Sequence, residues 1–488
     1  MAALMCRPSN IFKTIRFAQL GHLRNTQSVT VQDQYDEDAH YPPIKPKFPP
    51  GSWGEMEPLF AWFWENDREK ISALRNVKDK VDYITKGDHK VWKYNSLDTT
   101  PDMLEYQRKI TKTYMIRGSL PALYDDLSFD DHFDDSLLKK IISESIIQEL
   151  ELNRERFKKH AILRDHNRPH RLVHRYDYEH SNVLSLNWFS NLLGVLSARR
   201  KDIFDSHVDT DVKISACWSR HGVLRKMPRR KPRIAKGKEY LRQNNSEFYG
   251  EHTVDFQLRK SKPLPEFVPT NDEICHNLKY SSMEDYNPRV LGQFRGLVDR
   301  KFRPGYNIGS TNEFNHLSFI SLKNPKLKRI EITCGESYGR QANYGYAMST
   351  GFLSTVAQAH MLGFNMHEEL TYPFTTQTIL TDGQNFILSA YQLNTLQLWK
   401  DDKANTLQNV CWATESEKLY EEYKDGELVG FNDNLLKQIL KMFLIQPCDR
   451  NGIDLAPNLT DHKPSPLDIP GKIIYRTVEE DFKYDKGS

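Results

Sequence analysis

The residues best suited to binding chemistry are Lys and Arg side chains gathered between Arg220 and Arg242. This stretch holds ten basic residues against a single acid, Glu239. Pro228 and Pro232 exclude a continuous helix, so we expect the basic side chains to splay from an extended chain. Extended cationic segments suit the irregular phosphate surface of folded RNA. The predicted RNA-binding residues are Arg225, Lys226, Arg229, Arg230, Lys231, Arg233, Lys236 and Lys238.

Such a basic run has other interpretations, which this stretch alone leaves open. It also fits a solvated surface segment or a nuclear-targeting signal. A second basic region, residues 154–175, adds to the cationic surface and favours RNA as the partner. Which compartment the protein enters therefore bears directly on the interpretation.

Three histidines within the second basic region, His166, His170 and His174, recur every four residues. On a continuous helix this spacing would align three imidazoles for a metal ion. Pro169 interrupts such a helix, and a cation is disfavoured by the arginines around it. These neighbours are Arg164, Arg168, Arg171 and Arg175. We therefore interpret the histidines as surface groups or nucleic-acid contacts.

Recognisable catalytic motifs are missing from the sequence. It has no phosphate-binding loop, dinucleotide-binding fingerprint, zinc-protease motif or serine-hydrolase elbow. His360 and the His367-Glu368 pair are expected to be core or solvated groups, and Cys411 a buried structural thiol. The six aspartates of residues 125–135 are interpreted as a solvated acidic loop. We predict no catalytic residue, no metal ligand and no cofactor.

Composition indicates a folded protein with a large wetted or partner-covered surface. The chain has 488 residues, of which 38% are hydrophobic and 11% aromatic, and this is too apolar for a disordered protein. Its net charge of +3 conceals 68 basic and 65 acidic residues that are segregated along the chain. The six cysteines are too far apart for a paired zinc motif, which favours a reducing compartment. No stretch is apolar for long enough to predict a membrane span.

The N-terminal segment resembles a mitochondrial presequence. Residues 1–32 contain several basic residues and no acid, and the first acid is Asp33. Ile11, Phe12, Ile15 and Ala18 fall on one face of a helix, which gives the basic amphipathic pattern of import signals. A basic arm with chance periodicity is the alternative. With a presequence, nuclear targeting becomes the weaker interpretation of the basic run, and mitochondrial RNA the stronger one.

The elements that must position these residues indicate an α+β fold, with helices, antiparallel strands and extended N- and C-terminal segments. We expect a proline-rich strap at 41–51, a long amphipathic helix at 136–160 and a helix at 342–364. Short strands and turns are predicted between 213 and 340. A type I′ hairpin is predicted around Asp382-Gly383, and a helix is predicted after Asn432 as its N-cap. The tail after 446 is expected to be an extended surface segment.

Several long motifs resemble one known family, the mitochondrial ribosomal protein numbered thirty in the small-subunit list, also called programmed cell death protein 9. The motifs are VHRYDYEHSNVLSLNWFSNLLGVLS (173–197), EFVP (266–269), ILTDGQNFILSAYQLNTLQL (379–398), NVCWATESEKLYE (409–421) and GFNDNLLKQIL (430–440). The resemblance runs from about 170 to 446 and is strongest from 373 to 440. It divides the chain into a presequence (1–32), a strap with helices (33–170), a family core (171–446, with a hairpin-and-helix unit at 373–446) and a tail (447–488).

The resemblance implies a structural, non-catalytic protein of the mitochondrial ribosome in the matrix, and it implies membership of the large subunit. The implied partners are large-subunit rRNA and large-subunit proteins, above all a related protein numbered thirty-seven. Residues 225–238 are more basic than the family pattern, and the tail after 446 is longer, so neither inherits a role from the resemblance. The alternatives are a mitochondrial RNA-processing or RNA-modifying enzyme and a free signalling protein connected with cell death.

Overall fold

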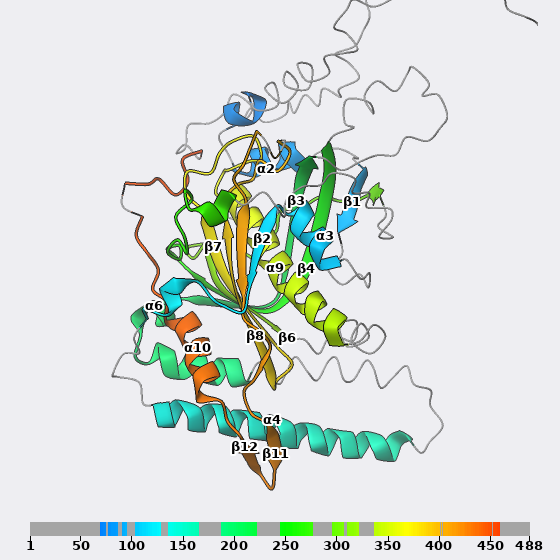
Figure 1. Cartoon of the computed structure of the whole chain (residues 1–488), viewed down its shortest axis with the longest axis vertical. Coiled ribbons are helices and arrows are strands. Elements are labelled where there is room, and N and C mark those ends of the chain that lie inside the picture. Colours follow the sequence, from blue (N-terminus) through cyan, green and yellow to red (C-terminus); the bar gives the residue numbers. More distant parts are fainter. Residues whose placement is uncertain are drawn as a thin grey trace, which may run out of the picture. The chain divides into compact units, whose positions relative to one another are not determined.

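The computed structural model describes most of the chain between residues 69 and 458 (Figure 1). The described residues are 69–74, 77–85, 90–94, 103–127, 135–164, 187–221, 245–276, 295–306, 310–321, 336–400, 402, 404–450 and 452–458. The chain divides into two compact units, 1–55 and 56–488, and every described residue belongs to the second. The predicted presequence and the proline-rich strap at 41–51 therefore lie outside the described residues.

One mixed β-sheet dominates the described part of the chain, where it has ten strands. Its path is β2-β9-β8-β7-β6-β4-β1-β5, with β10 beside β8 and β3 beside β4. Its strands are β1 (Lys90–Tyr94), β2 (Thr113–Arg117), β3 (His207–His221), β4 (Asn245–Lys260), β5 (Arg295–Leu297), β6 (Phe314–Ser321), β7 (Phe374–Thr381), β8 (Asn385–Leu393), β9 (Asn409–Ala413) and β10 (Glu417–Lys418). A separate hairpin pairs β11 (Glu422–Lys424) with β12 (Glu427–Val429). Three pairs, β1 with β4, β2 with β9 and β6 with β7, are parallel, which the expectation of antiparallel strands did not include.

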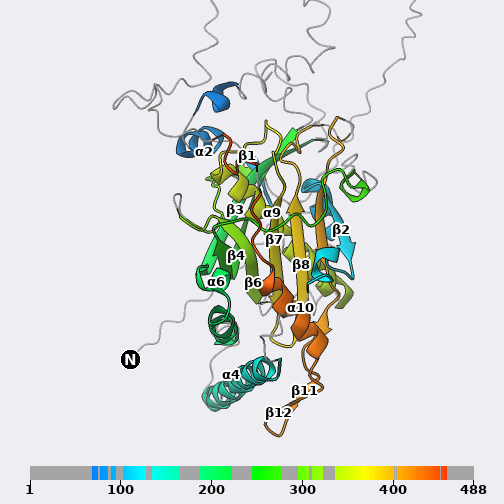
Figure 2. The same cartoon turned by 90° about the vertical axis from the view of Figure 1, so that its left-hand side faces the viewer.

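Helices cover both faces of this sheet, so the predicted α+β class is confirmed. The described helices are α2 (Val77–Thr85), α3 (Met103–Ile110), α4 (Asp135–Arg164), α6 (Lys201–Phe204), α9 (Glu336–Met361), α10 (Asp433–Leu444), the 3-10 turns η1 (Ala122–Tyr124) and η3 (Glu273–His276), and two helices over 69–73 and 187–197. One hydrophobic core lies between the sheet and α9 with α3. The other lies between the sheet and α4, helix 187–197 and α10. Figure 2 shows α9 and α10 on opposite sides of the strands.

The predicted helices occur where their patterns place them. The helix predicted at 136–160 is α4, and the helix predicted at 342–364 is α9. Asn432 caps α10 as expected, because its side-chain oxygen accepts a hydrogen bond of 3.0 Å from the Leu435 amide. In these three helices, apolar residues recur at helical spacing along the sequence.

The hairpin predicted around Asp382-Gly383 is confirmed as β7 and β8, but its turn type is not I′. A type I′ turn needs positive φ at both central residues, and here Gly383, with φ of 100°, is the one residue of 382–385 that has a positive φ. The Asp382 carboxylate instead accepts from the amides of Gln384 (2.9 Å) and Asn385 (2.7 Å). The Asp382 side chain therefore caps the turn.

Helix α9 is buried on every side, which is unusual for a helix in a small domain. Residues 344–360 are all buried, and the helix contacts β3, β4, β6, β7, β8 and β9 as well as α2 and α3. Several of its hydroxyl groups bond within the helix: Ser349 donates to the Gly345 carbonyl (2.6 Å) and Thr355 to the Gly351 carbonyl (2.8 Å). Polar side chains can therefore line a helix that has no wet face.

Two glycines let other elements approach α9 closely. A Cβ at Gly351 would lie 2.6 Å from Cβ of Tyr391 in β8. A Cβ at Gly345 would lie 1.9 Å from Oε1 of Gln107 in α3. These distances are too short for non-bonded atoms. Glycine therefore fits at these two positions because neighbouring residues occupy the space that a side chain would need.

We expect Gly351→Ala to lower the free energy of unfolding by about 1–3 kcal/mol, because the new methyl group overpacks the contact with β8. Gly194→Ala is the matched control, since Gly194 lies exposed in helix 187–197 with no atom within 4 Å of its Cβ position. That control should raise stability by about 0.5–1 kcal/mol through helix propensity. Urea denaturation of the purified variants measures both values, and a stabilising Gly351→Ala would contradict the close contact.

Candidate functional site

The predicted RNA-binding residues, Arg225 to Lys238, lie outside the described residues, but the strands on both sides of them are described. Strand β3 ends at His221 and β4 begins at Asn245, and these two residues are paired in antiparallel register. Segment 222–244 therefore leaves the sheet and returns to it at one place. We call the described residues around His221 and Asn245 the root of the basic segment.

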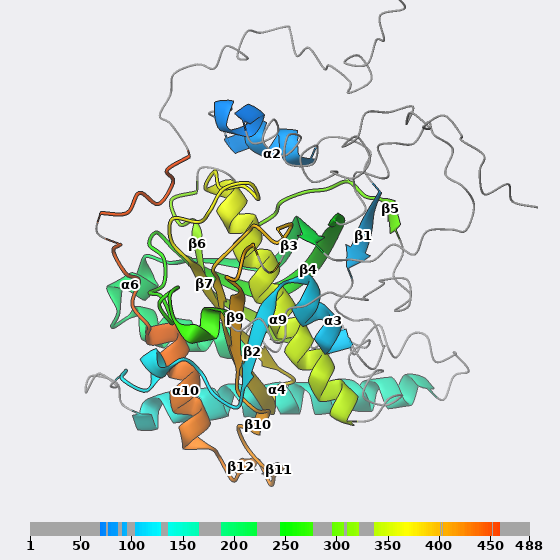
Figure 3. The same cartoon turned by 45° about the horizontal axis from the view of Figure 1, so that its top comes forward.

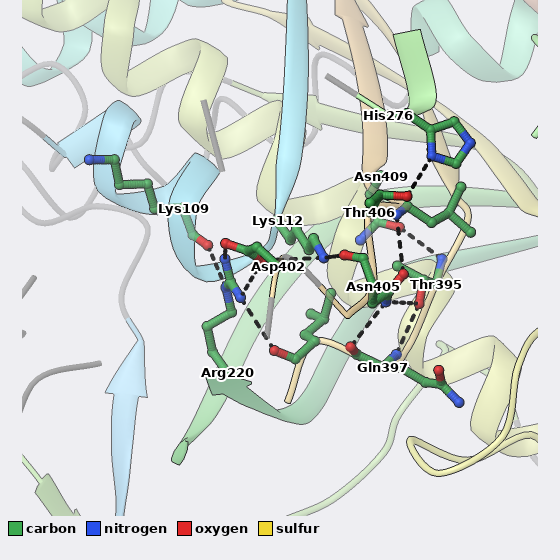
Figure 4. Close-up of polar contacts among 12 residues, drawn as sticks. Lys109, Lys112, Arg220, His276, Thr395, Gln397, Asp402, Asn405, Thr406 and Asn409 are labelled. Atoms are coloured by element: carbon green, nitrogen blue, oxygen red, sulfur yellow. Dashed lines mark hydrogen bonds and ion pairs between the residues drawn. The ribbon is translucent and has the colours of Figure 1, made fainter. Parts of the chain in front are cut away.

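Arg220 anchors this root (Figure 4). Its side chain is fully buried, and its two terminal nitrogens contact the two carboxylate oxygens of Asp402 at 3.0 and 3.1 Å. Its Nε donates to the Lys109 carbonyl (2.9 Å), and the amide of His221 donates to the Leu398 carbonyl (3.0 Å). A bidentate arginine–carboxylate pair is both strong and geometrically specific, so the end of β3 is fixed in place.

Lys112 brings a second buried cation to the same carboxylate. Its Nζ lies 3.2 Å from Oδ1 of Asp402, and it also donates to the carbonyl of Asn405. Lys112 has a left-handed backbone, with φ of 49°, in the turn between α3 and β2. Two buried cations thus share Asp402, whose side chain is 19% exposed. Removing that carboxylate would leave both cations without their principal counter-charge.

Asparagine side chains order the connection between β8 and β9, which carries Asp402. Oδ1 of Asn409 accepts from the amides of Asn394 (2.8 Å) and Thr395 (3.1 Å), and its Nδ2 donates to the Thr111 carbonyl (3.1 Å). Asn405 donates to the Thr395 hydroxyl and the Gln397 carbonyl, both at 3.2 Å. Figure 4 shows these bonds continuing from the charge cluster toward the contact of Thr406 with His276. Asp402 is therefore held on an ordered scaffold.

The cluster joins two strands that are far apart in the sheet path. Lys112 precedes β2 at one edge, and Arg220 belongs to β3, which pairs with β4 near the other end of the path. The indole of Trp218 in β3 adds a bond of 3.0 Å to the carbonyl of Ile110. Lys112, Arg220 and Trp218 are buried, so they hold the strands together and are not exposed to an external phosphate.

The thiols and imidazoles considered for catalysis are buried structural groups where the structure describes them. Cys411 is buried in β9, as predicted, and burial raises the pKa of its thiol to about 12. His360 lies in the core, where its Nδ1 is 2.8 Å from the Val356 carbonyl oxygen and its ring stacks on Phe302. Burial lowers its pKa to about 4. His367 is buried near Trp399. Near neutral pH, Cys411 is therefore a thiol rather than a thiolate, and His360 is a neutral imidazole.

Other candidates fall partly or wholly outside the described residues. His166, His170 and His174 do so entirely, and of the acidic loop only 125–127 and 135 are described. Within the described ranges, no group of three potential metal-ligating residues comes together. Across the same ranges, no helix is long and apolar enough to cross a membrane.

Sequence reasoning did not single out Arg220, Lys112 or Asp402. Arg220 is the first residue of the basic stretch, and its type alone does not distinguish it from the arginines that follow. One usable signal was its place at the end of the apolar run ISACWSR (214–220), which predicts a buried strand. A charged residue inside such a run requires a buried partner. The identity of that partner, 182 residues away, is set by the fold.

We expect Asp402→Asn to lower the free energy of unfolding by about 3–5 kcal/mol, because it leaves Arg220 and Lys112 buried without their shared counter-charge. Asp299→Asn is the control, since the Asp299 side chain is 76% exposed beside Lys301. Its loss should cost less than about 1 kcal/mol. Equal midpoints for the two variants in urea denaturation would show that the cluster does not fasten β3.

The buried histidines predict acid destabilisation. Burial lowers the pKa of His252 and of His316 to about 3, and that of His360 to about 4, from a usual value of 6.5. At pH values between the lowered pKa and 6.5, the unfolded chain binds more protons than the folded chain. The free energy of unfolding therefore decreases as pH falls below 6.5. Asp255 acts in the opposite direction, because burial raises its pKa to about 6.

His252→Phe isolates one of these contributions. It should reduce the slope of unfolding free energy against pH, between pH 4 and 6, by about 1.4 kcal/mol per pH unit. Denaturant titrations at a series of pH values provide the slopes. An unchanged slope in the variant would show that His252 is protonated in the folded state.

A sequence model of one protein family, described as "Mitochondrial 28S ribosomal protein S30 (PDCD9)", matches residues 11–447 of the chain. The match extends well before residue 170, where the recognised motifs begin. The description names the 28S subunit, which is the small one, so the expectation of large-subunit membership is wrong. The expected large-subunit rRNA and the large-subunit protein numbered thirty-seven are withdrawn as partners for the same reason. The motifs identify the family, but they contain no feature that specifies a ribosomal subunit. With most of its length matched, the chain belongs to the PDCD9 family of mitochondrial ribosomal proteins.

Proposed function

We propose that the protein is a structural, non-catalytic component of the mitochondrial ribosome in the matrix, where it supports mitochondrial translation. The observation that carries this proposal is the family match over residues 11–447. The buried state of Cys411, His360 and His367 agrees with it, because these groups serve packing. Residues 1–32 act as the presequence in this account, and residues 171–446 as the family core.

The basic segment provides the contact with ribosomal RNA. Arg225 to Lys238 leave the sheet from a root fixed by the Arg220–Asp402 pair. A fixed root limits where the cationic side chains can reach, so less conformational entropy is lost when they bind. Their affinity comes from neutralising phosphates and releasing counterions, and it is therefore sensitive to salt.

An RNA-processing or RNA-modifying enzyme would need an acid, imidazole or thiol positioned by a second group beside an accessible pocket. The imidazoles of His252, His316 and His360 are instead buried, with lowered pKa values. Cys217 and Cys411 are buried thiols whose pKa burial raises to about 12. No observation among the described residues favours the enzymatic alternative.

Sedimentation of the endogenous protein from mitochondrial lysate tests the ribosomal role. We expect comigration with ribosomal particles that is lost after ribonuclease digestion, and the family description predicts the 28S peak. Markers for both subunits are followed in the same gradient. A slow peak that is indifferent to ribonuclease would contradict the ribosomal role, whereas comigration with large-subunit markers alone would contradict only the subunit named in the description.

Charge reversal tests the basic segment. Replacing Arg229, Arg230 and Lys231 with glutamate should weaken incorporation into ribosomal particles, and the deficit relative to the unaltered chain should be largest at low salt, because fewer phosphate contacts make binding less sensitive to salt. The matched control reverses three exposed lysines of the sheet and its hairpins, with the same change in net charge: Lys213, Lys418 and Lys424. Quantitative sedimentation at two or more salt concentrations measures both variants. Equal incorporation of the two variants at low salt would show that the segment does not contact phosphate.

A further inference from the structure

The chain after α10 runs back along the molecule to the helix that is first in the element order. Residues 446–450 and 452–458, which we call the C-terminal strap, contain no helix or strand. In Figures 1 and 3 the strap leaves α10 and passes toward α2 at the opposite end of the sheet. An irregular segment of this kind is fixed only where its backbone finds partners, and the strap finds them at both ends.

The first half of the strap is bonded to the loop after β4. The Cys448 amide donates to the Pro263 carbonyl (2.8 Å). Arg450, whose side chain is 5% exposed, contacts Glu266 at 3.0 Å and donates to the Leu264 carbonyl at 3.2 Å. Its guanidinium also lies 5.0 Å from the centre of the Tyr372 ring. A buried arginine side chain with these partners fixes the strap to the loop after β4.

The second half of the strap reaches α2. The Tyr372 hydroxyl donates to the Leu455 carbonyl at 2.6 Å, and the Leu455 side chain packs against the core around α9. Nζ of Lys80 in α2 donates to the Asn458 carbonyl, also at 2.6 Å. Lys80 is only 3% exposed, and burial lowers its pKa while Glu368 opposes that shift. A buried ammonium needs such an acceptor, so losing the strap would cost α2 one of its attachments.

Apart from the strap, helix α2 contacts the core through α9 and through the buried Val77. It is nine residues long, which is too short to be stable alone in water. Val81 and Ile84 pack only partly buried against the core, and Arg300 donates to the Thr85 carbonyl at 3.2 Å. The family match ends at 447, one residue before the first backbone bond of the strap. The contacts that the strap makes near α2 are thus made by residues beyond the matched part of the chain.

We propose that the C-terminal strap is a latch that holds α2 on the core, and that its release frees α2 while the sheet and α9 stay folded. Arg450 fixes the strap at the loop after β4, and the Asn458 carbonyl receives Lys80. In this arrangement the C-terminal strap and α2, near the two ends of the described residues, are linked by direct contacts. The device is independent of the ribosomal role, since it concerns contacts within one chain.

Hydrogen exchange followed by mass spectrometry tests the latch in the full chain. In Arg450→Met and in Lys80→Met, the amides of Val77–Thr85 should exchange about tenfold faster or more, because each variant removes charge-assisted bonds of the latch. Amides of α9 should keep their protection. Lys262→Met is the matched control: its ion pair with Asp449 also joins the strap to the loop, but both side chains are about half exposed (49% and 62%). We expect it to leave α2 unchanged.

Two shortened chains separate the strap from the residues that follow it. A stop after Asn458 should exchange like the full chain, and a stop after Gln446 should expose α2 as the point variants do. Unchanged exchange in α2 for the point variants would overturn the proposal. Loss of protection in α9 together with α2 would also overturn it, because the strap would then be part of the global fold and not a local latch.

Discussion

The burial of residues 344–360 of α9 on every side is the constraint on which the rest of the structure depends. A helix with no wet face must satisfy its polar groups internally and must allow neighbours to approach from every direction. Ser349 and Thr355 meet the first condition by returning their hydroxyl groups to the helix backbone. Gly345 and Gly351 meet the second, because α3 and β8 occupy the space where their side chains would be. The parallel crossover from β6 through α9 to β7 brings the helix onto one face of the sheet.

Packing the sheet against α9 also requires β2 and β3, which lie far apart in the sheet path, to be held in fixed positions. Arg220 at the end of β3 and Lys112 before β2 converge on Asp402, and Trp218 adds a bond to the end of α3. The same cluster fixes the point at which the basic segment begins. Packing around α9 and presentation of the basic segment are therefore linked, since both depend on one carboxylate in the connection between β8 and β9.

Local patterns in the sequence predicted local structure well. The apolar spacing of α4 and α10, the Asn432 cap and the Asp382-Gly383 hairpin are all encoded within a few turns or residues. The parallel pairing of β2 with β9 joins residues about 300 positions apart, and no short pattern encodes it. The same holds for Arg220 and Asp402, whose roles depend on a contact made by the fold. Long motifs identified the family, but subunit membership belongs to the assembled particle and was assigned wrongly.

Electron cryo-microscopy of mitochondrial ribosomes tests directly whether the sheet, with α9 packed on one face, presents the basic segment to ribosomal RNA. The account predicts density that fits the sheet with α9 as one rigid body, and it predicts residues 222–244 beside RNA phosphates. Particles that contain no such density would contradict the ribosomal role. Density for the sheet with the basic segment directed away from RNA would contradict the role assigned to that segment.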